Sequence, residues 1–231
     1  MRHRIFVDGI AQSIDVRGDE FHHAVRVARV REGEEIEVFD GKGHAARGKV
    51  GEIGPDSLRV DIENEIASRE SRVRLHLAPA IIHLDKFELV LQKATELGAA
   101  SITPLVTERT EVREERYRGK KERWEKIVLE AVKQSGRSVI PRVNDATRFD
   151  EVVKKDGARI VFDADEEPDA APEHVDEMII LVGPEGGWSE AEIALARKSH
   201  CTFQRLGTRR LRAETASIAA LSILGSRYGD I

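Results

Sequence analysis

The sequence predicts an α/β protein in which a small β-rich module precedes a larger α/β domain. Apolar and polar residues alternate with a period of two in the first 70 residues, as in half-buried strands. From about residue 72, strand patterns alternate with helical patterns, and several strand patterns are short, wholly apolar runs typical of parallel sheets. We therefore expect two domains, residues 1–71 and residues 72–231.

The β-rich module shows its clearest alternation at residues 58–63, where aliphatic and charged residues take turns. Residues 35–39 and 47–53 follow the same pattern, and the glycines of residues 41–43 supply a turn between them. Residues 20–30 instead place apolar side chains at helical spacing, with histidines and arginines on the other faces. This segment predicts one short basic helix.

The larger domain alternates strands and helices. Its expected strands are residues 73–80, 101–106, 158–162, 178–182 and 202–206. Its expected helices are residues 86–97, 122–135, a helix that begins after Ser189, and residues 213–228. Gly98 follows the first helix where a left-handed cap belongs, and Ser189 with Glu192 has the spacing of a capping box. The last helix is apolar on most sides, which predicts burial against another layer or another subunit.

Composition restricts the class of protein. The chain has 231 residues, of which 40% are hydrophobic and 34% charged, so it is globular rather than disordered. Its apolar runs are too short to span a membrane and its first residues lack a signal-peptide pattern, so we expect a cytoplasmic protein without membrane contact. The single cysteine, Cys201, excludes an internal disulfide and multi-cysteine zinc sites, and we expect a buried structural thiol and no metal.

The net charge of -5 is unevenly distributed. Residues 150–177 contain 11 acidic and three basic residues, which leaves a net charge of +3 on the rest of the chain. Arginines are frequent before residue 32, and residues 109–123 contain seven Lys or Arg against four Glu. These basic stretches suit either an RNA-binding surface or an ordinary solvated one.

Two glycine-bearing stretches indicate where a ligand binds. In residues 181–189 and again in residues 206–216, an apolar run breaks into a turn and restarts as a helix. Two such turns at one edge of a sheet would expose backbone groups to a small ligand. The chain has no phosphate-binding loop, no dinucleotide fingerprint and no nucleophile elbow, which favours an uncharged or zwitterionic cofactor.

Five motifs, in the same order, resemble those of the ribosomal RNA small subunit methyltransferase E family, within the SPOUT superfamily, over nearly the whole chain. They are Phe39-Asp40-Gly41-Lys42-Gly43, residues 91–98, Gln134-Ser135-Gly136-Arg137, residues 182–187 and residues 211–216. The resemblance implies a PUA-like RNA-binding domain, a SPOUT-type α/β domain with a deep trefoil knot, and a homodimer. It also implies S-adenosylmethionine as cofactor and N3-methylation of a uridine in 16S rRNA, free or in the small ribosomal subunit.

The resemblance also suggests site residues. The expected cofactor-binding residues are Leu77, Val182, Gly183, Gly187, Leu206, Gly207, Leu211, Arg212, Ala213 and Thr215. We expect Arg212 to stabilise the uracil anion, and Glu185 or Glu214 to accept its proton unless these carboxylates are structural. The expected RNA contacts are Arg2, Arg4, Arg17, His22, Arg26 and Arg137. Arg210 stands where the family usually has isoleucine or valine.

Two other functions stay open at this point. The same fold suits a ribose 2'-O-methyltransferase, and the chain also suits an RNA-binding assembly factor without catalytic activity. Methylation of uracil at carbon 5 is disfavoured, because that chemistry needs an attacking cysteine and Cys201 falls on an expected strand.

Overall fold

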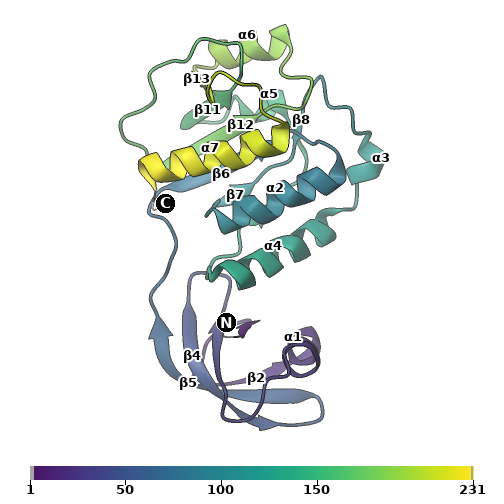
Figure 1. Ribbon diagram of the computed structural model, residues 1–231, viewed down its shortest axis with the longest axis vertical. Coiled ribbons are helices and arrows are strands. Elements are labelled where there is room, and N and C mark those ends of the chain that lie inside the picture. The colour runs from purple at the N-terminus through teal and green to yellow at the C-terminus, as the bar shows by residue number, and fades with distance from the viewer. Residues whose placement is uncertain (1–2, 230) are drawn as a thin grey trace. The chain divides into compact units, whose positions relative to one another are not determined.

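The structure is a computed structural model that describes residues 3–229 and residue 231 (Figure 1). The chain forms two compact units. The N-terminal unit comprises residues 1–70 and 132–140, and the C-terminal unit comprises residues 71–131 and 141–231. The expected boundary after residue 71 lies within one residue of the point where the chain first passes from the N-terminal to the C-terminal unit, after residue 70. Residues 132–140, however, belong to the N-terminal unit rather than to the second domain. Sequence periodicity gives no sign of this return, because the segment is short and runs on from a helix.

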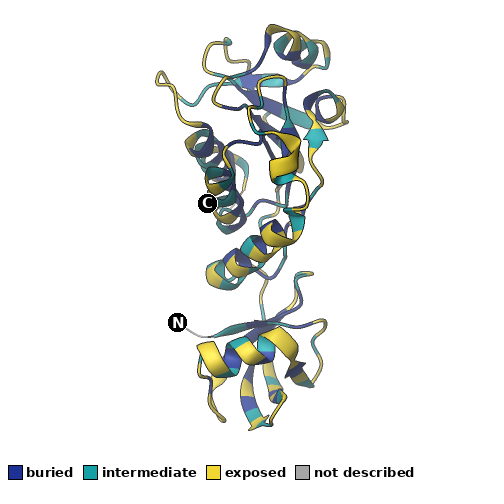
Figure 2. Cartoon of the chain, turned by 90° about the vertical axis from the view of Figure 1, so that its right-hand side faces the viewer, coloured by how far each residue is buried: buried dark blue, intermediate teal, exposed yellow. Residues whose placement is uncertain are grey.

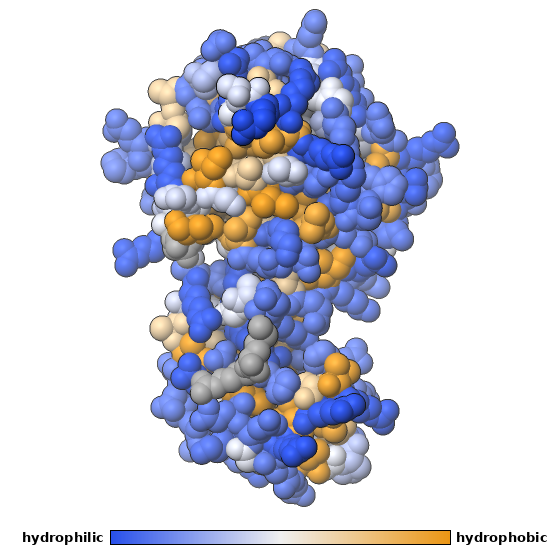
Figure 3. Space-filling model, in the orientation of Figure 1, coloured by the Kyte–Doolittle hydropathy of each residue, from blue (hydrophilic) through white to orange (hydrophobic). Residues whose placement is uncertain are grey.

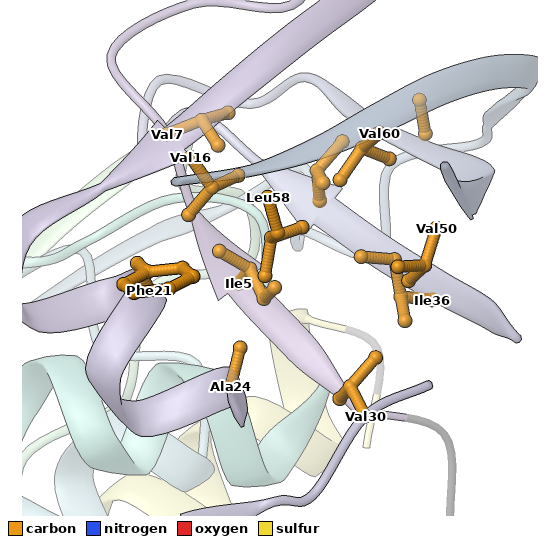
Figure 4. Close-up of a cluster of buried hydrophobic side chains, with 12 residues drawn as sticks. Ile5, Val7, Val16, Phe21, Ala24, Val30, Ile36, Val50, Leu58 and Val60 are labelled. Carbon is orange, nitrogen blue, oxygen red and sulfur yellow. The ribbon is translucent and has the colours of Figure 1, made fainter. Parts of the chain in front are cut away.

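A five-stranded sheet forms the N-terminal unit. Its strands are β1 (Arg4–Phe6), β2 (Ser13–Arg17), β3 (Glu35–Phe39), β4 (Ala45–Ile53) and β5 (Ser57–Ile66). The spatial order is β1-β3-β4-β5-β2, with β1 parallel to β3 and the other pairs antiparallel. The alternating side chains of these strands fill one core, which includes Ile36, Leu58 and Val60 (Figure 4). The three strands expected from alternation are thereby confirmed.

The basic helix of the N-terminal unit is shorter than predicted. Helix α1 (Gly18–His22) continues as a single π-helical stretch, η1 (His23–Val27), instead of running to residue 30. The N–H of Ala28 donates to the carbonyl of His23, a bond that spans five residues, and Arg29 then turns the chain with φ of 54°. Neither feature has a signature in the spacing of apolar residues.

A parallel sheet forms the centre of the C-terminal unit, as predicted, with six strands where the sequence predicted five. Its strands are β6 (Arg74–Pro79), β7 (Ser101–Ile102), β9 (Arg142–Val143), β11 (Ala158–Phe162), β12 (Glu177–Val182) and β13 (Thr202–Gln204). The spatial order is β13-β11-β12-β6-β7-β9. Since all neighbouring pairs are parallel, β13, β11 and β12 end side by side at one edge of the sheet.

The strand expected at residues 101–106 is interrupted. Residues 101–102 form β7 of the main sheet, whereas β8 (Leu105–Val106) pairs with β10 (Thr147–Arg148) in a separate two-stranded sheet. Pro104 lies between the two pieces and has no N–H to donate to a neighbouring strand.

Helices alternate with the strands of the parallel sheet along the chain. They are α2 (Leu84–Glu96), α3 (Glu114–Tyr117), α4 (Lys121–Ser135), α5 (Phe149–Val152), α6 (Glu190–Lys198) and α7 (Ala213–Tyr228). Helices α5 and α6 pack on the sheet face formed by Val161, Leu181 and Phe203. Helix α7 packs against β6, β12 and α2, and buried and exposed residues alternate around the helices (Figure 2). Among the described residues, no helix has the length and apolarity that a membrane span requires.

Candidate active site

The carboxyl ends of β13, β11 and β12 open into a cavity of about 510 Å³ within the C-terminal unit. Three segments contribute most of its lining: residues 162–165 from the end of β11, residues 182–188 from the end of β12, and most of residues 206–213 up to the start of α7. We call these the acidic segment (residues 163–176), the glycine turn (residues 183–188) and the arginine loop (residues 205–212). The two glycine-bearing stretches singled out in the sequence therefore meet at one sheet edge, and the volume suits a small-molecule ligand.

Two glycines make the glycine turn compact, one by its backbone conformation and one by its lack of a side chain. The N–H of Gly187 donates to the carbonyl of Pro184 at 2.9 Å, and Gly187 has φ of 70°, a left-handed conformation that favours glycine. A Cβ atom on Gly183 would lie 3.1 Å from the indole ring of Trp188. Glycine at this position thus lets the chain pass directly over the tryptophan.

Trp188 and the following helix cap fix the inner end of the glycine turn. The buried indole Nε1–H donates to the carbonyl of Phe162 at 3.0 Å, and the ring lies 4.7 Å from that of Phe149. The hydroxyl of Ser189 accepts the N–H of Glu192, and the Glu192 carboxylate accepts the N–H of Ser189, so the predicted capping box is confirmed. The turn is therefore tied both to β11 and to α6.

Two basic side chains hold the outer end of the glycine turn. The Arg109 guanidinium donates to the carbonyl of Gly186 at 2.8 Å. The Lys86 ammonium lies 3.4 Å from the carboxylate of Glu185. The sequence does not identify Arg109 as a site residue, because Arg109 is far from the glycine turn in the chain and no motif spacing connects the two.

The arginine loop forms the opposite wall. Leu206, Leu211 and Ala213 give this wall apolar surface, and Gly207 turns the chain with φ of 96°. Arg209 and Arg212 are exposed, and the described part of the chain records no ion pair for either. They give the edge of the cavity a positive charge.

The acidic segment supplies a third wall that the sequence did not reveal. The Asp163 carboxylate accepts the N–H groups of Asp165 and Glu166 at 2.7 and 2.9 Å, which closes a tight turn. Arg205 donates to the carbonyl oxygens of Asp165 and Glu166, and Arg210 donates to the Asp165 carboxylate. Only the position of the acidic segment could have indicated this wall, because the segment follows β11, the strand that pairs with β12.

Eight of the ten expected cofactor-binding residues line the cavity. They are Val182, Gly183, Gly187, Leu206, Gly207, Leu211, Arg212 and Ala213. The structure does not support the other two. Leu77 is fully buried in the middle of β6, where it pairs with Ile180 of β12 and Ile102 of β7. Thr215 is exposed on α7 and is not part of the cavity wall.

The three expected catalytic residues separate into two groups. Arg212 and Glu185 lie on the cavity wall, from the arginine loop and the glycine turn respectively. Glu214 is buried in the first turn of α7 and is not a cavity residue. It therefore fits the structural alternative better than a role in proton transfer.

The expected RNA contacts are also divided. The side chain of Arg4 is only 8% exposed; its guanidinium donates to the carbonyl of Val132 at 2.9 Å and lies 3.3 Å from the Glu37 carboxylate, and desolvation lowers the pKa of the guanidinium. Arg137 is buried in an ion pair with Glu70, at 2.6 Å. Both guanidinium groups therefore have partners inside the protein, which makes these two the weakest candidates among the expected RNA contacts. Arg17, His22 and Arg26 are exposed on β2 and the adjoining helix, and Arg2 lies outside the described residues.

The remaining expectations concern Cys201 and metal ions. Cys201 is buried, burial raises the pKa of its thiol, and it does not line the cavity. A buried neutral thiol is a poor nucleophile, as expected for a structural cysteine. Within residues 3–229 and residue 231, no cluster of three or more metal-ligating side chains occurs.

Comparisons with known proteins match both units. An RNA methyltransferase domain family matches residues 69–225, and an RNA methyltransferase PUA domain family matches residues 16–63. The chain is 30% identical to the ribosomal RNA small subunit methyltransferase E of Bacillus subtilis, covering 93% of this chain and 90% of that protein. It is 31% identical to the protein of the same name from Synechocystis, covering 92% and 73%.

A solved structure resembles the whole chain. The crystal structure of a ribosomal RNA small subunit methyltransferase E from Neisseria gonorrhoeae, bound to S-adenosyl methionine, superimposes with a TM-score of 0.92. The two chains are 29% identical, and the match covers 100% of each.

Proposed function

The chain belongs to the ribosomal RNA small subunit methyltransferase E family, and from this membership we propose that it transfers a methyl group from S-adenosylmethionine to N3 of a uridine in 16S rRNA. The observation that carries the proposal is the cavity at the carboxyl ends of β13, β11 and β12. Its volume and its walls suit this cofactor. The similar protein from Neisseria gonorrhoeae is solved with S-adenosyl methionine bound.

The lining residues fit the parts of S-adenosylmethionine. Leu206, Leu211 and Val182 offer apolar surface to an adenine ring. The glycine turn and the arginine loop expose backbone groups, since Gly183 and Gly207 carry no side chain to cover them. The absence of a phosphate-binding loop agrees with a cofactor that has no phosphate.

The bound cofactor supplies an activated methyl group on a sulfonium, so the protein's main task is to hold the acceptor in line with it. Orientation of this kind contributes about 7 to 11 kcal/mol to lowering a barrier. The glycine turn is suited to this task because Trp188, the Ser189 cap, Arg109 and Lys86 fix it at both ends. A rigid wall keeps the reacting groups aligned.

In this proposal Arg212 stabilises the negative charge that develops on uracil, and Glu185 accepts the proton. Uracil N3 loses its proton when the methyl group is transferred, and the negative charge that develops on the flanking carbonyls is stabilised by the Arg212 guanidinium. Glu185 accepts the N3 proton, directly or through water, because it lies on the cavity wall whereas Glu214 does not.

The acceptor nucleotide has to be unpaired, since N3 belongs to the Watson–Crick edge of uracil. Unstacking costs a few kcal/mol, which contacts elsewhere on the RNA offset. We assign this binding to the PUA-like N-terminal unit, where Arg17, His22 and Arg26 are exposed. Free 16S rRNA or the small ribosomal subunit in the cytoplasm supplies the target.

Two family features complete the proposal: a deep trefoil knot at the arginine loop, and a homodimer. The dimer is supported by apolar residues that stay exposed on two helices packed against each other, Leu89 of α2 at 40% and Ile223 of α7 at 50%. Figure 3 shows apolar side chains gathered on this face of the C-terminal unit. Such a patch suits an interface with a second copy.

The experiment that tests the function is methylation in vitro followed by nucleoside analysis. The purified protein is incubated with labelled S-adenosylmethionine and small subunits or 16S rRNA from cells lacking the protein. The proposal predicts label in 3-methyluridine. Label in a ribose-methylated nucleoside would establish the 2'-O-methyltransferase alternative, and cofactor binding without any transfer would favour the assembly factor.

A further inference from the structure

Beyond Arg205, which is bonded to the acidic segment, the arginine loop is held in place by very few contacts. Between Leu206 and Leu211, the described structure records one hydrogen bond or ion pair, from Nη2 of Arg210 to Oδ2 of Asp165 at 2.6 Å. Residues 207–212 are all exposed, so packing adds little to fix their position. A segment with few buried contacts opens at a small cost in free energy.

The acidic segment, in contrast, is firmly braced. Asp163 caps the turn that presents Asp165, and Arg205 donates to main-chain carbonyls of the same turn at 2.7 and 2.8 Å. Arg197 forms an ion pair with Glu166 at 3.0 Å. The main chain at Asp165 is therefore well fixed, whereas residues 206–211 are held by fewer contacts.

The Arg210–Asp165 pair also spans the cavity. Its two residues come from two different walls, the arginine loop and the acidic segment, and both line the site. If the pair opens, the stretch from Leu206 to Leu211 loses its one recorded hydrogen bond or ion pair, and Arg205 is the remaining anchor at the start of the loop.

We propose that the Arg210–Asp165 ion pair is a latch that holds the arginine loop closed over the bound cofactor and so sets the cofactor's residence time. The inference rests on the proposed function, because it needs S-adenosylmethionine in this cavity. Arg210 acts through the loop, so it is a positioning residue and not a catalytic one. An exposed pair contributes little to overall stability, but on a stretch with no other recorded side-chain anchor between Leu206 and Leu211 its loss appears in the dissociation rate.

The test compares the single variants Arg210→Gln and Asp165→Asn with the charge-swapped double variant, Arg210→Asp with Asp165→Arg. Dissociation of labelled S-adenosylmethionine is followed by chase and rapid filtration at several salt concentrations. We expect each single variant to raise the dissociation rate about threefold to fivefold, the size expected for an exposed pair. The swapped variant restores a slow rate. Salt accelerates dissociation from the wild type and the swap more than from the single variants, because it screens the pair.

Arg118→Gln is the matched control. It breaks the Arg118–Glu114 pair, which has a similar distance of 2.7 Å and side chains 76% and 57% exposed, against 75% and 73% for the latch. It lies outside the cavity wall, and dissociation from this variant should equal that from the wild type.

Three results would overturn the latch. Unchanged dissociation from both single variants would show that the pair does not hold the loop. Faster dissociation from Asp165→Asn with slower dissociation from Arg210→Gln would show that Asp165 contacts the cationic cofactor directly. Failure of the wild type to bind S-adenosylmethionine would overturn the proposed function and the latch with it, whereas a failed latch in a protein that binds leaves the function intact.

Discussion

At the scale of single residues, Arg212 occupies the position on which the proposed chemistry depends. It is exposed at the cavity edge, immediately before α7, and the described structure records no ion pair that would occupy it. A guanidinium held there suits an anion that forms during the reaction, in preference to the neutral uracil before it.

Arg212→Ala is expected to lower single-turnover methylation by about 100-fold to 1,000-fold, the range for removing one donor to a developing anion. Cofactor affinity, measured by calorimetry, should change by less than about threefold, because the cofactor is held by both loops. The control is Arg209→Ala, which removes another exposed charge from the same loop and should reduce turnover far less. Loss of affinity and turnover together in Arg212→Ala would show that the arginine is structural.

Gly183→Val is expected to abolish measurable cofactor binding. The structure gives a different reason from the one that the sequence suggests: the new side chain meets the Trp188 ring, at 3.1 Å from the Cβ position, and displaces the glycine turn. Gly183→Ala should weaken binding by a smaller factor, since the ring has to move only slightly. Gly54→Val is the control, because a Cβ on Gly54 would have ordinary contacts. A Gly183→Val protein that folds and still binds the cofactor would place the site elsewhere.

The sequence predicted the site residues that lie within the two glycine-bearing stretches. It did not predict which other residues reach the site, because that depends on how distant segments come together in the fold. Leu77 is buried between neighbouring strands, so an apolar residue of a central strand is indistinguishable from a ligand contact by type alone. Arg137 belongs to a recognised motif, yet its charge is used inside the N-terminal unit against Glu70. Partners that are distant in the chain leave no spacing from which to infer them.

At the scale of elements, helix α6 connects the cavity that we propose for the cofactor with the rest of the C-terminal unit. Its capping box follows directly on Trp188, and Oε1 of Glu192 also accepts the N–H of Glu108 at 2.9 Å. One buried carboxylate therefore ties the start of the helix to the segment that carries Arg109.

Ser189→Ala is expected to lower the free energy of unfolding by about 0.5 to 2 kcal/mol, the usual cost of losing a helix cap. Urea denaturation measures the change. Ser226→Ala, an exposed position within α7, is the control and should change stability by less than about 0.5 kcal/mol. Equal stability of wild type and Ser189→Ala would contradict the role given to the cap.

The elements with strong periodicity or clear caps were predicted well. Residues 158–162 and 213–228 form β11 and α7 with the predicted bounds, and Gly98 has φ of 85°, as the left-handed cap requires. The short strands β1, β9 and β10 were missed, because two or three residues show no period. The π-helical stretch η1 was not predicted for another reason: a single wider turn changes the helical register of the side chains without changing the composition of the segment.

At the scale of the whole molecule, the proposed homodimer makes a direct prediction. Sedimentation velocity should give twice the chain mass of 25.8 kDa, and Ile223→Arg should shift the protein toward the monomer by placing a charge in the apolar interface. Val27→Arg, on an apolar side chain of the N-terminal unit that is 69% exposed, is the control and should leave the mass unchanged. A wild type that sediments as a monomer would contradict the proposed dimer.

The central claim is that the cavity at the ends of β13, β11 and β12 holds S-adenosylmethionine between the glycine turn and the arginine loop. A crystal structure of the protein grown with this cofactor tests the claim most directly. The account predicts the cofactor in contact with Gly183, Gly207 and Leu211, with its methyl group directed toward Arg212. Cofactor bound in the N-terminal unit, or a cavity that stays empty in crystals containing saturating cofactor, would contradict it.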